Sequence, residues 1–155
     1  MEVVTMKRMI AKVATVSAAA MTVALVPLAG TSYAAGCGGA GCDNRGPVSM
    51  GCDGDAVTKA SVTARNHPGL RAELRWSPSC TAAWVRVTAD GEQWWDRYGS
   101  VEKWGGKGTD FQRSLQVKFP NPGQDWSNML GSPTAYYRVC IKDTATDLVD
   151  CSVFW

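Results

Sequence analysis

The clearest structural signal in this chain is residues 70–89, LRAELRWSPSCTAAWVRVTA. In the first part apolar side chains alternate with charged ones, and in the second part alanine and valine alternate with larger or polar side chains. A period of two places each set on its own face, as in half-buried β-strands. Pro78 interrupts the pattern because proline has no N–H to donate to a neighbouring strand. These residues therefore predict two strands joined by a short connection.

Trp84 has two predicted positions in the second of these strands. If the valines face the core, Trp84 lies on the outer face beside Arg86, whose guanidinium can stack on the indole. The opposite phase places Trp84 inside, where a large aromatic side chain is usually mostly buried. The alternation is compatible with both.

Three further motifs accompany this segment. A glycine-rich start with a C-x4-C pair is followed by C-x-x-DA-x-T, formed here by Cys52, Asp55, Ala56 and Thr58. Residues 126–129, WSNM, complete the set. Together with LRWSPSCTAAWVRV they resemble the YjfA-like family, a domain of unknown function in secreted proteins of actinomycetes, although Asn128 stands where that family usually has proline and residues 92–104 depart from its pattern. The resemblance implies a fold and an extracellular location, but no activity and no catalytic residues.

The rest of the chain also favours strands. Alternating segments occupy residues 56–64, 111–119, 135–141 and 148–154, and no window keeps a helical period over three turns. Asp90-Gly91 predicts a hairpin turn after the second central strand. About six to eight short strands with turn signals every 8–12 residues predict an all-β fold, a small disulfide-stapled β-sandwich or barrel.

Residues 1–34 have the composition of an export signal. A positive start is followed by an uncharged run over residues 13–28 and by small residues at positions −3 and −1 before a predicted cleavage after Ala34. We expect a signal peptide over residues 1–34, from Met1 or Met6, and a single all-β secreted domain over 35–155. A membrane-spanning helix is the weaker alternative because the run is shorter than ~20 residues and contains Pro27. Acylation of Cys37, as in a lipoprotein, is a second alternative.

Charge excludes two classes of partner. The chain has 16 basic and 14 acidic side chains, and the predicted signal holds Lys7, Arg8, Lys12 and Glu2, so the remainder is near neutral. A near-neutral domain has no basic field to hold nucleic acid or anionic lipid. We therefore expect no nucleic-acid partner, and no membrane partner after signal cleavage.

The six cysteines all follow the predicted cleavage point, and an even number in an exported chain predicts three disulfides. If residues 135–141 and 148–154 form a hairpin, Cys140 and Cys151 lie opposite each other, and Cys80 remains for a bridge to the N-terminal cysteines. Zinc bound by those three is the alternative, with a spacing that matches zinc knuckles poorly. We expect no metal and no cofactor. The disulfide cysteines are Cys37, Cys42, Cys52, Cys80, Cys140 and Cys151.

Seven tryptophans in so short a chain suggest either a core filled with aromatic rings or an aromatic binding surface. Carboxylates near the tryptophan-rich segment are weak candidates for an acid–base pair of the kind that hydrolyses glycosides. The only histidine, His67, is expected in a solvated turn rather than in a catalytic triad. The candidate ligand-binding aromatics are Trp84, Trp94, Trp95, Tyr98 and Trp104. The candidate carboxylates are Glu92, Asp96 and Glu102.

Three functions are compatible with these residues. An excess of aromatic side chains without a catalytic constellation favours a non-catalytic extracellular binding or envelope-associated module, for cell-wall or another polysaccharide. The alternatives are a small secreted polysaccharide hydrolase, and an inhibitor or toxin-like partner of an extracellular protein. We expect binding rather than catalysis.

Overall fold

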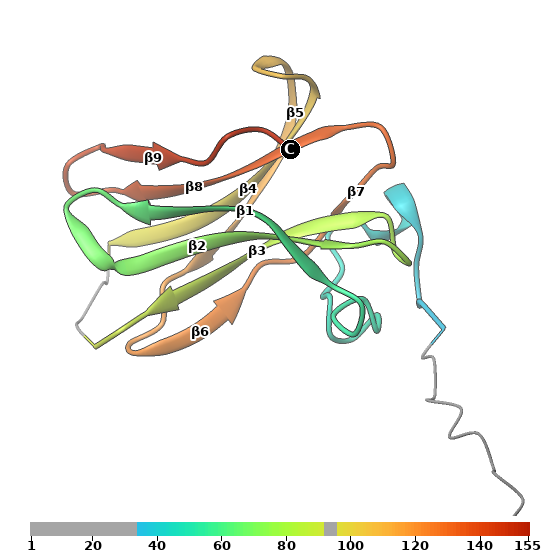
Figure 1. Ribbon diagram of the computed structural model, residues 1–155, viewed down its shortest axis with the longest axis horizontal. Helices are drawn as coiled ribbons and strands as arrows, with labels where there is room; N and C mark the ends of the chain where they lie inside the picture. Colours follow the sequence, from blue (N-terminus) through green and yellow to red (C-terminus); the bar gives the residue numbers. More distant parts are fainter. Residues whose placement is uncertain (1–33, 92–95) are drawn as a thin grey trace, which may run out of the picture. The chain divides into compact units, whose positions relative to one another are not determined.

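The computed structural model describes residues 34–91 and 96–155, and nearly all regular structure in this part of the chain is β-strand (Figure 1). A single turn of 3-10 helix, η1 (Gly39–Cys42), precedes the strands. None of the described helical structure is long and apolar enough to cross a membrane. The expected all-β class is confirmed.

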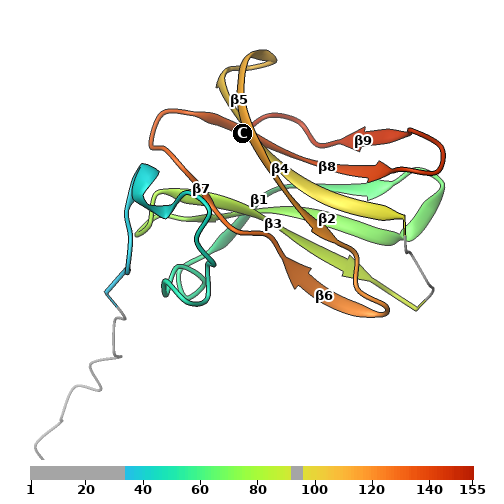
Figure 2. The same cartoon turned by 180° about the vertical axis from the view of Figure 1, so that it is seen from behind.

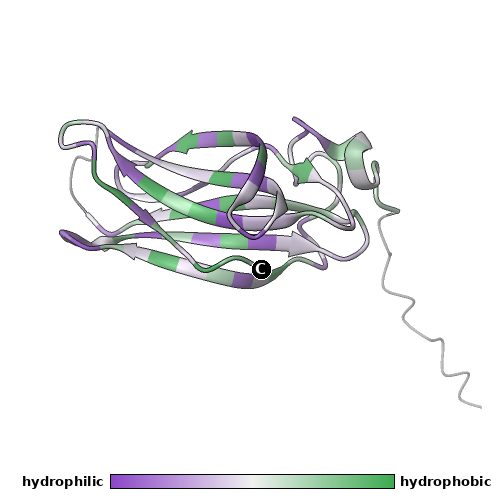
Figure 3. Ribbon diagram, turned by 90° about the horizontal axis from the view of Figure 1, so that it is seen from above, coloured by the Kyte–Doolittle hydropathy of each residue, from purple (hydrophilic) through white to green (hydrophobic). Residues whose placement is uncertain are grey.

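The strands form two antiparallel sheets that pack face to face (Figures 1 and 2). Along the strands, apolar and polar residues alternate, as the colouring of Figure 3 shows. The first sheet contains β1 (Val57–Ala64), β2 (His67–Ser77), β3 (Ala82–Ala89), β6 (Gly123–Trp126) and β7 (Leu130–Gly131). The second sheet contains β5 (Thr109–Lys118), β4 (Arg97–Gly106), β8 (Tyr136–Asp143) and β9 (Val149–Cys151).

The two predicted central strands form the hairpin of β2 and β3, paired from Leu70↔Ala89 to Ser77↔Ala82. Their small and branched side chains point between the sheets and are fully buried against residues of β4 and β8. Burying one of the leucine or valine side chains stabilises the fold by roughly 1.5–3 kcal/mol, and an alanine contributes less. The inward-facing residues of the hairpin are Leu70, Ala72, Leu74, Ala83, Val85, Val87 and Ala89.

The hairpin turn predicted at Asp90-Gly91 is wrong. The strand that follows, β4, pairs with β5 and β8 in the second sheet, so the chain crosses from one sheet to the other after β3. The edge of β3 that a hairpin partner would occupy is taken by β6, where Thr88 pairs with Gln124. Asp90-Gly91 therefore lies in the connection between the two sheets and not in a hairpin turn.

Strand β5 shows how one extra residue changes which face a side chain occupies. Strict alternation places Phe111 on the same face as Leu115, but the pairing of β4 with β5 shifts by one residue between Lys103 and Trp104. Such a bulge turns the side chains beyond it to the opposite face. Phe111 is consequently 53% exposed and lies edge-on to Trp104, with their ring centroids 5.1 Å apart.

Three disulfides link the described cysteines: Cys37–Cys42, Cys52–Cys80 and Cys140–Cys151. The third joins β8 to β9 and confirms the pairing expected from the hairpin. The second ties the N-terminal disulfide-bonded segment, residues 37–52, to the connection between β2 and β3. The four sulfurs of the first two bridges lie within 4.8 Å of one another, a donor set of the kind that binds zinc. Because each sulfur is bonded to another sulfur, none of the four is the thiolate that a zinc site requires.

Close packing between the sheets depends on Gly99 of β4. A Cβ at this position would overlap with Cγ1 of Val87, which is fully buried on the facing strand. Valine is stiff about χ1 and cannot turn away freely. The sheets therefore approach one another only because residue 99 has no side chain.

We predict that Gly99→Ala lowers the free energy of unfolding by about 1–3 kcal/mol, the usual cost of overpacking a core, when measured by urea denaturation. Gly54→Ala is the matched control, because nothing lies near an added Cβ there. In the double variant Gly99→Ala/Val87→Ala, the loss in free energy of unfolding should be smaller than the sum of the losses in the two single variants. Full additivity, or an effect no larger than that of Gly54→Ala, would contradict this packing.

Candidate binding groove

Trp84 lies on the outer face of its sheet and is nevertheless buried, with 3% of its surface exposed. The valines of β3 face the core, so the first of the two predicted phases is correct. The indole is covered from outside by the N-terminal disulfide-bonded segment and by Met129, which together form a second apolar cluster. The members of that cluster are Cys42, Cys52, Cys80, Ala82, Trp84 and Met129.

The other candidate aromatics do not form one platform. Tyr98 and Trp104 share the outer face of β4, but they are six positions apart along the strand, roughly 20 Å. Trp104 packs instead against Phe111 and Phe154, and the guanidinium carbon of Arg138 lies 5.1 Å from its ring centroid. The remaining aromatic candidates, Trp94 and Trp95, lie outside the described residues.

The candidate carboxylates are not arranged as a catalytic pair where the structure describes them. Glu102 Oε2 accepts hydrogen bonds from Trp104 Nε1 at 3.0 Å and Arg138 Nε at 2.7 Å. Asp96 directly precedes Arg97, the first residue of β4, and therefore lies roughly 20 Å from Glu102 along the chain. Glycosidases place their two carboxylates about 5–10 Å apart. Glu92 lies outside the described residues.

The three aspartates between Asp43 and Asp55 serve separate contacts. Asp43 accepts a hydrogen bond from the backbone N–H of Gly131. Asp55 accepts from the Ser77 hydroxyl and from the backbone N–H of Ser79, which fixes the connection between β2 and β3. Asp53 faces a groove on the outer surface of the first sheet.

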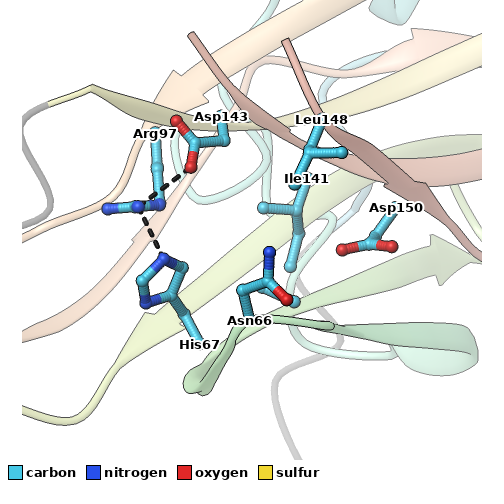
Figure 4. A pocket seen from close by; sticks show the side chains of 8 residues that line it. Asn66, His67, Arg97, Ile141, Asp143, Leu148 and Asp150 are labelled. Carbon is cyan, nitrogen blue, oxygen red and sulfur yellow. Dashed lines mark hydrogen bonds and ion pairs between the residues drawn. The ribbon is translucent and has the colours of Figure 1, made fainter. Parts of the chain in front are cut away.

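His67 is not the solvated turn residue that the sequence predicts. It begins β2, and its Nε2 lies 2.6 Å from Nη2 of Arg97, which also donates to Asp143 Oδ2 at 2.9 Å (Figure 4). Because arginine only donates, Nε2 of His67 is the acceptor. This contact joins the first sheet to the second. The hollow beside it has a volume of about 20 Å³, room for one water molecule, so the arrangement is a structural clamp.

A second hollow, of about 280 Å³, is an aromatic cleft at one end of the sandwich. The rings of Trp76 and Trp155 are 4.9 Å apart there, and Lys59 Nζ lies 4.6 Å from the Trp155 ring. The cleft is lined by Trp76, Ser132, Pro133, Thr134, Ala135, Tyr136 and Trp155.

A third hollow, of about 230 Å³, lies on the outer face of the first sheet, and we call it the groove. Strand register builds its floor, because Arg75 stands opposite Trp84, and Arg86 stands opposite Trp126. The disulfide-bonded segment forms one wall and β6 the other. The groove is lined by Pro47, Val48, Asp53, Arg75, Trp84, Arg86, Gln124 and Trp126.

The arginines of the groove are held in place by different partners. Arg86 forms an ion pair with Glu73, with contacts of 2.6 and 2.8 Å to the same carboxylate oxygen. Arg75 donates to Thr58 Oγ1 and to the carbonyl of Ala56, both at 2.7 Å. Burial, and then the charge of Arg86, lower the pKa of Arg75, and Glu73 offsets part of that effect.

Trp126 is the exposed aromatic residue of the groove, and sequence analysis did not select it as a candidate. Its side chain is 44% exposed, whereas Trp84 beneath the same groove is covered. The sequence carried one relevant signal, since Trp126 begins the diverged motif at residues 126–129. The Trp126 side chain points outward because Trp126 pairs with Arg86 of β3, a residue forty positions earlier in the sequence.

Comparison with known protein families matches residues 40–135 to a family described as "Protein of unknown function (DUF2690)". The chain belongs to the DUF2690 family. No curated protein matches the chain, and no solved structure matches it. The DUF2690 match contains every residue that lines the groove, but it ends before Tyr136 and Trp155 of the aromatic cleft and before Asp143 of the clamp. Of these three hollows, the groove is the one that lies wholly within the DUF2690 domain.

The clamp makes stability depend on pH. Burial alone would raise the pKa of Asp143, but hydrogen bonds from Ala145 and Thr146 and the charge of Arg97 lower it below its ordinary value. A carboxylate with a lowered pKa in the folded state stabilises the fold at neutral pH, and this contribution is lost as pH falls below about 4.

We predict that the free energy of unfolding decreases between pH 5 and pH 2.5, and that Asp143→Asn makes this decrease smaller while lowering stability at pH 7. Urea denaturation at several pH values measures both effects. Asp147→Asn, which alters an exposed carboxylate in the connection after β8, is the control and should leave the pH dependence unchanged. An identical pH dependence in the Asp143→Asn variant would contradict the role of the clamp.

Proposed function

We propose that this protein is a secreted, non-catalytic binding or envelope-associated module that recognises a polysaccharide, of the cell wall or another source, through the groove. The proposal includes export by the signal peptide expected at residues 1–34 and membership of the YjfA-like group of actinobacterial proteins. Three disulfides are compatible with an oxidising extracellular space, where such bonds persist.

The observation that carries the proposal is an exposed indole beside fixed hydrogen-bonding groups. The Trp126 ring offers a flat apolar face to the C–H groups of a sugar. The amide of Gln124 and the guanidinium of Arg86, on the same sheet face, can bind hydroxyl groups. At about 230 Å³ the groove is smaller than the pockets that enclose whole drug-sized ligands, about 300–1,000 Å³, so it suits one unit of a polymer.

The groove is also cross-linked by a disulfide, which favours binding. Its floor is the central hairpin, and its wall is tied to that hairpin by the Cys52–Cys80 bridge. A site that is ordered before the ligand arrives loses less conformational entropy on binding. Catalysis has no comparable support, because the described candidates Asp96 and Glu102 are not paired.

A second candidate is docking of an extracellular protein, as an inhibitor or toxin-like partner. Trp126 and Arg86 lie side by side on adjacent strands. Tryptophan and arginine are among the residue types that contribute most binding energy in protein interfaces. This candidate is favoured if no polysaccharide binds and the chain instead binds an extracellular protein, with that binding lost in Trp126→Ala.

We predict that residues 35–155 are retained on insoluble peptidoglycan, chitin or cellulose, and that Trp126→Ala weakens the retention at least about tenfold, as expected for an aromatic residue central to a contact. Tryptophan fluorescence during titration with soluble fragments gives the dissociation constant. Phe111→Ala is the matched control, since Phe111 is an aromatic residue of similar exposure on the other sheet. No retention of the unaltered chain, or full retention of Trp126→Ala, would refute the proposal.

A further inference from the structure

We propose that the groove selects anionic saccharides, in which a carboxylate or phosphate group is bound by Arg75 and Arg86 while the sugar ring lies against Trp126. This inference rests on the proposed function and specifies its ligand class.

The first argument is the balance of charge on the outer face of the first sheet. Arg71 and Arg86 both pair with Glu73, at 3.3 and 2.6 Å, so one carboxylate serves two guanidinium groups. Arg75 joins them on the same face, and its hydrogen bonds go to neutral oxygens. This face of β2 and β3 therefore carries three arginines and a single carboxylate, which pairs with two of them.

The second argument is the position of Arg75. Its side chain is half-buried, and the bonds to Thr58 and Ala56 hold the guanidinium plane in one orientation at the groove. A cation that is partly removed from water interacts more strongly with an anion than one in bulk solvent. A planar guanidinium also donates two parallel hydrogen bonds to a carboxylate or phosphate, which a lysine cannot do.

The third argument concerns the opposing charge. Asp53 is the acidic residue among those that line the groove, and it is exposed on the wall opposite β6. It disfavours an anion at that wall, so the favoured position is at Arg75 and Arg86 on the side of Trp126. The chain as a whole is near neutral outside the predicted signal, so the attraction is local to the groove.

Together these features describe a site for an acidic sugar unit. The acid group comes either from a uronic-acid type carboxylate or from a phosphodiester that links polyol or sugar units. Both present paired anionic oxygens of the kind that guanidinium groups bind.

The test measures binding of residues 35–155 to polygalacturonate, to poly(glycerol phosphate) and to a neutral soluble glucan, by calorimetry at two salt concentrations. We expect at least about tenfold tighter binding to one of the anionic polymers, weakened by salt because charges contribute. Which polymer binds identifies carboxylate or phosphate as the acid group. Arg75→Gln should remove the preference for the anion and leave the weaker binding to neutral glucan.

Two controls separate specific recognition from general attraction. Arg75→Lys keeps the charge but not the planar donor pair, and we expect it to lose most of the preference. Lys107→Gln removes an exposed charge from the β4–β5 connection, and we expect it to change nothing. Near-ultraviolet circular dichroism of each variant reports that the fold is intact.

The possible failures are distinguishable. Equal binding to the neutral and anionic polymers, or an unchanged preference in Arg75→Gln, overturns the inference and leaves polysaccharide binding in place. Absence of binding to all three polymers and to the insoluble polysaccharides overturns the proposed function and the inference together.

Discussion

The burial of Trp84 beneath residues 37–52 is the contact on which the outer surface of the first sheet depends. A strand of a two-layer sandwich normally exposes its outward side chains, and Trp84 points outward. A tryptophan buries about 150–250 Å² of surface, which at about 25 cal/mol per Å² corresponds to roughly 4–6 kcal/mol as an upper bound. The N-terminal segment has little regular structure of its own, so this burial and the Cys52–Cys80 bridge keep it on the sheet.

The same segment connects the two sheets and shapes the groove. Figures 1 and 2 agree that η1 and the turns after it lie beside β7 and the adjoining end of β3. Asp43 accepts from Gly131 N–H in the first sheet and pairs at 3.5 Å with Lys103 of the second. Gly131 permits the approach, because a Cβ there would overlap with the carbonyl group of Gly39. The wall of the groove is thus held by a disulfide, an ion pair and close backbone packing.

The part of the fold that sequence predicts well is the part governed by local periodicity. Alternation over residues 70–89 correctly assigns β2 and β3 but leaves open whether the valines or Trp84 face the core, and the hairpin at the end of the chain correctly pairs Cys140 with Cys151. These features depend on neighbours in sequence or on a short turn. The short strands β6 and β7 have too few residues to show a period, and they were not predicted.

The features that sequence misses depend on contacts between distant segments. Trp84 is buried because a loop more than thirty residues earlier in the chain folds over it, and periodicity carries no information about such a cover. Phe111 turns outward because of a bulge opposite Trp104, which removes it from the face its alternation predicts. Trp126 lines the groove because it pairs with Arg86. The residues of the groove could therefore be grouped only once the register of β3 and β6 was known.

Hydrogen exchange of the tryptophan indole N–H groups, followed by nuclear magnetic resonance, tests the burial of Trp84 most directly. The account predicts that the Trp84 indole exchanges far more slowly than the exposed Trp126 indole. It also predicts that this protection is lost in a Cys52→Ala/Cys80→Ala variant whose Val85 and Val87 amides remain protected. Equally fast exchange at Trp84 and Trp126 in the unaltered protein, or full protection of Trp84 without the bridge, would contradict it.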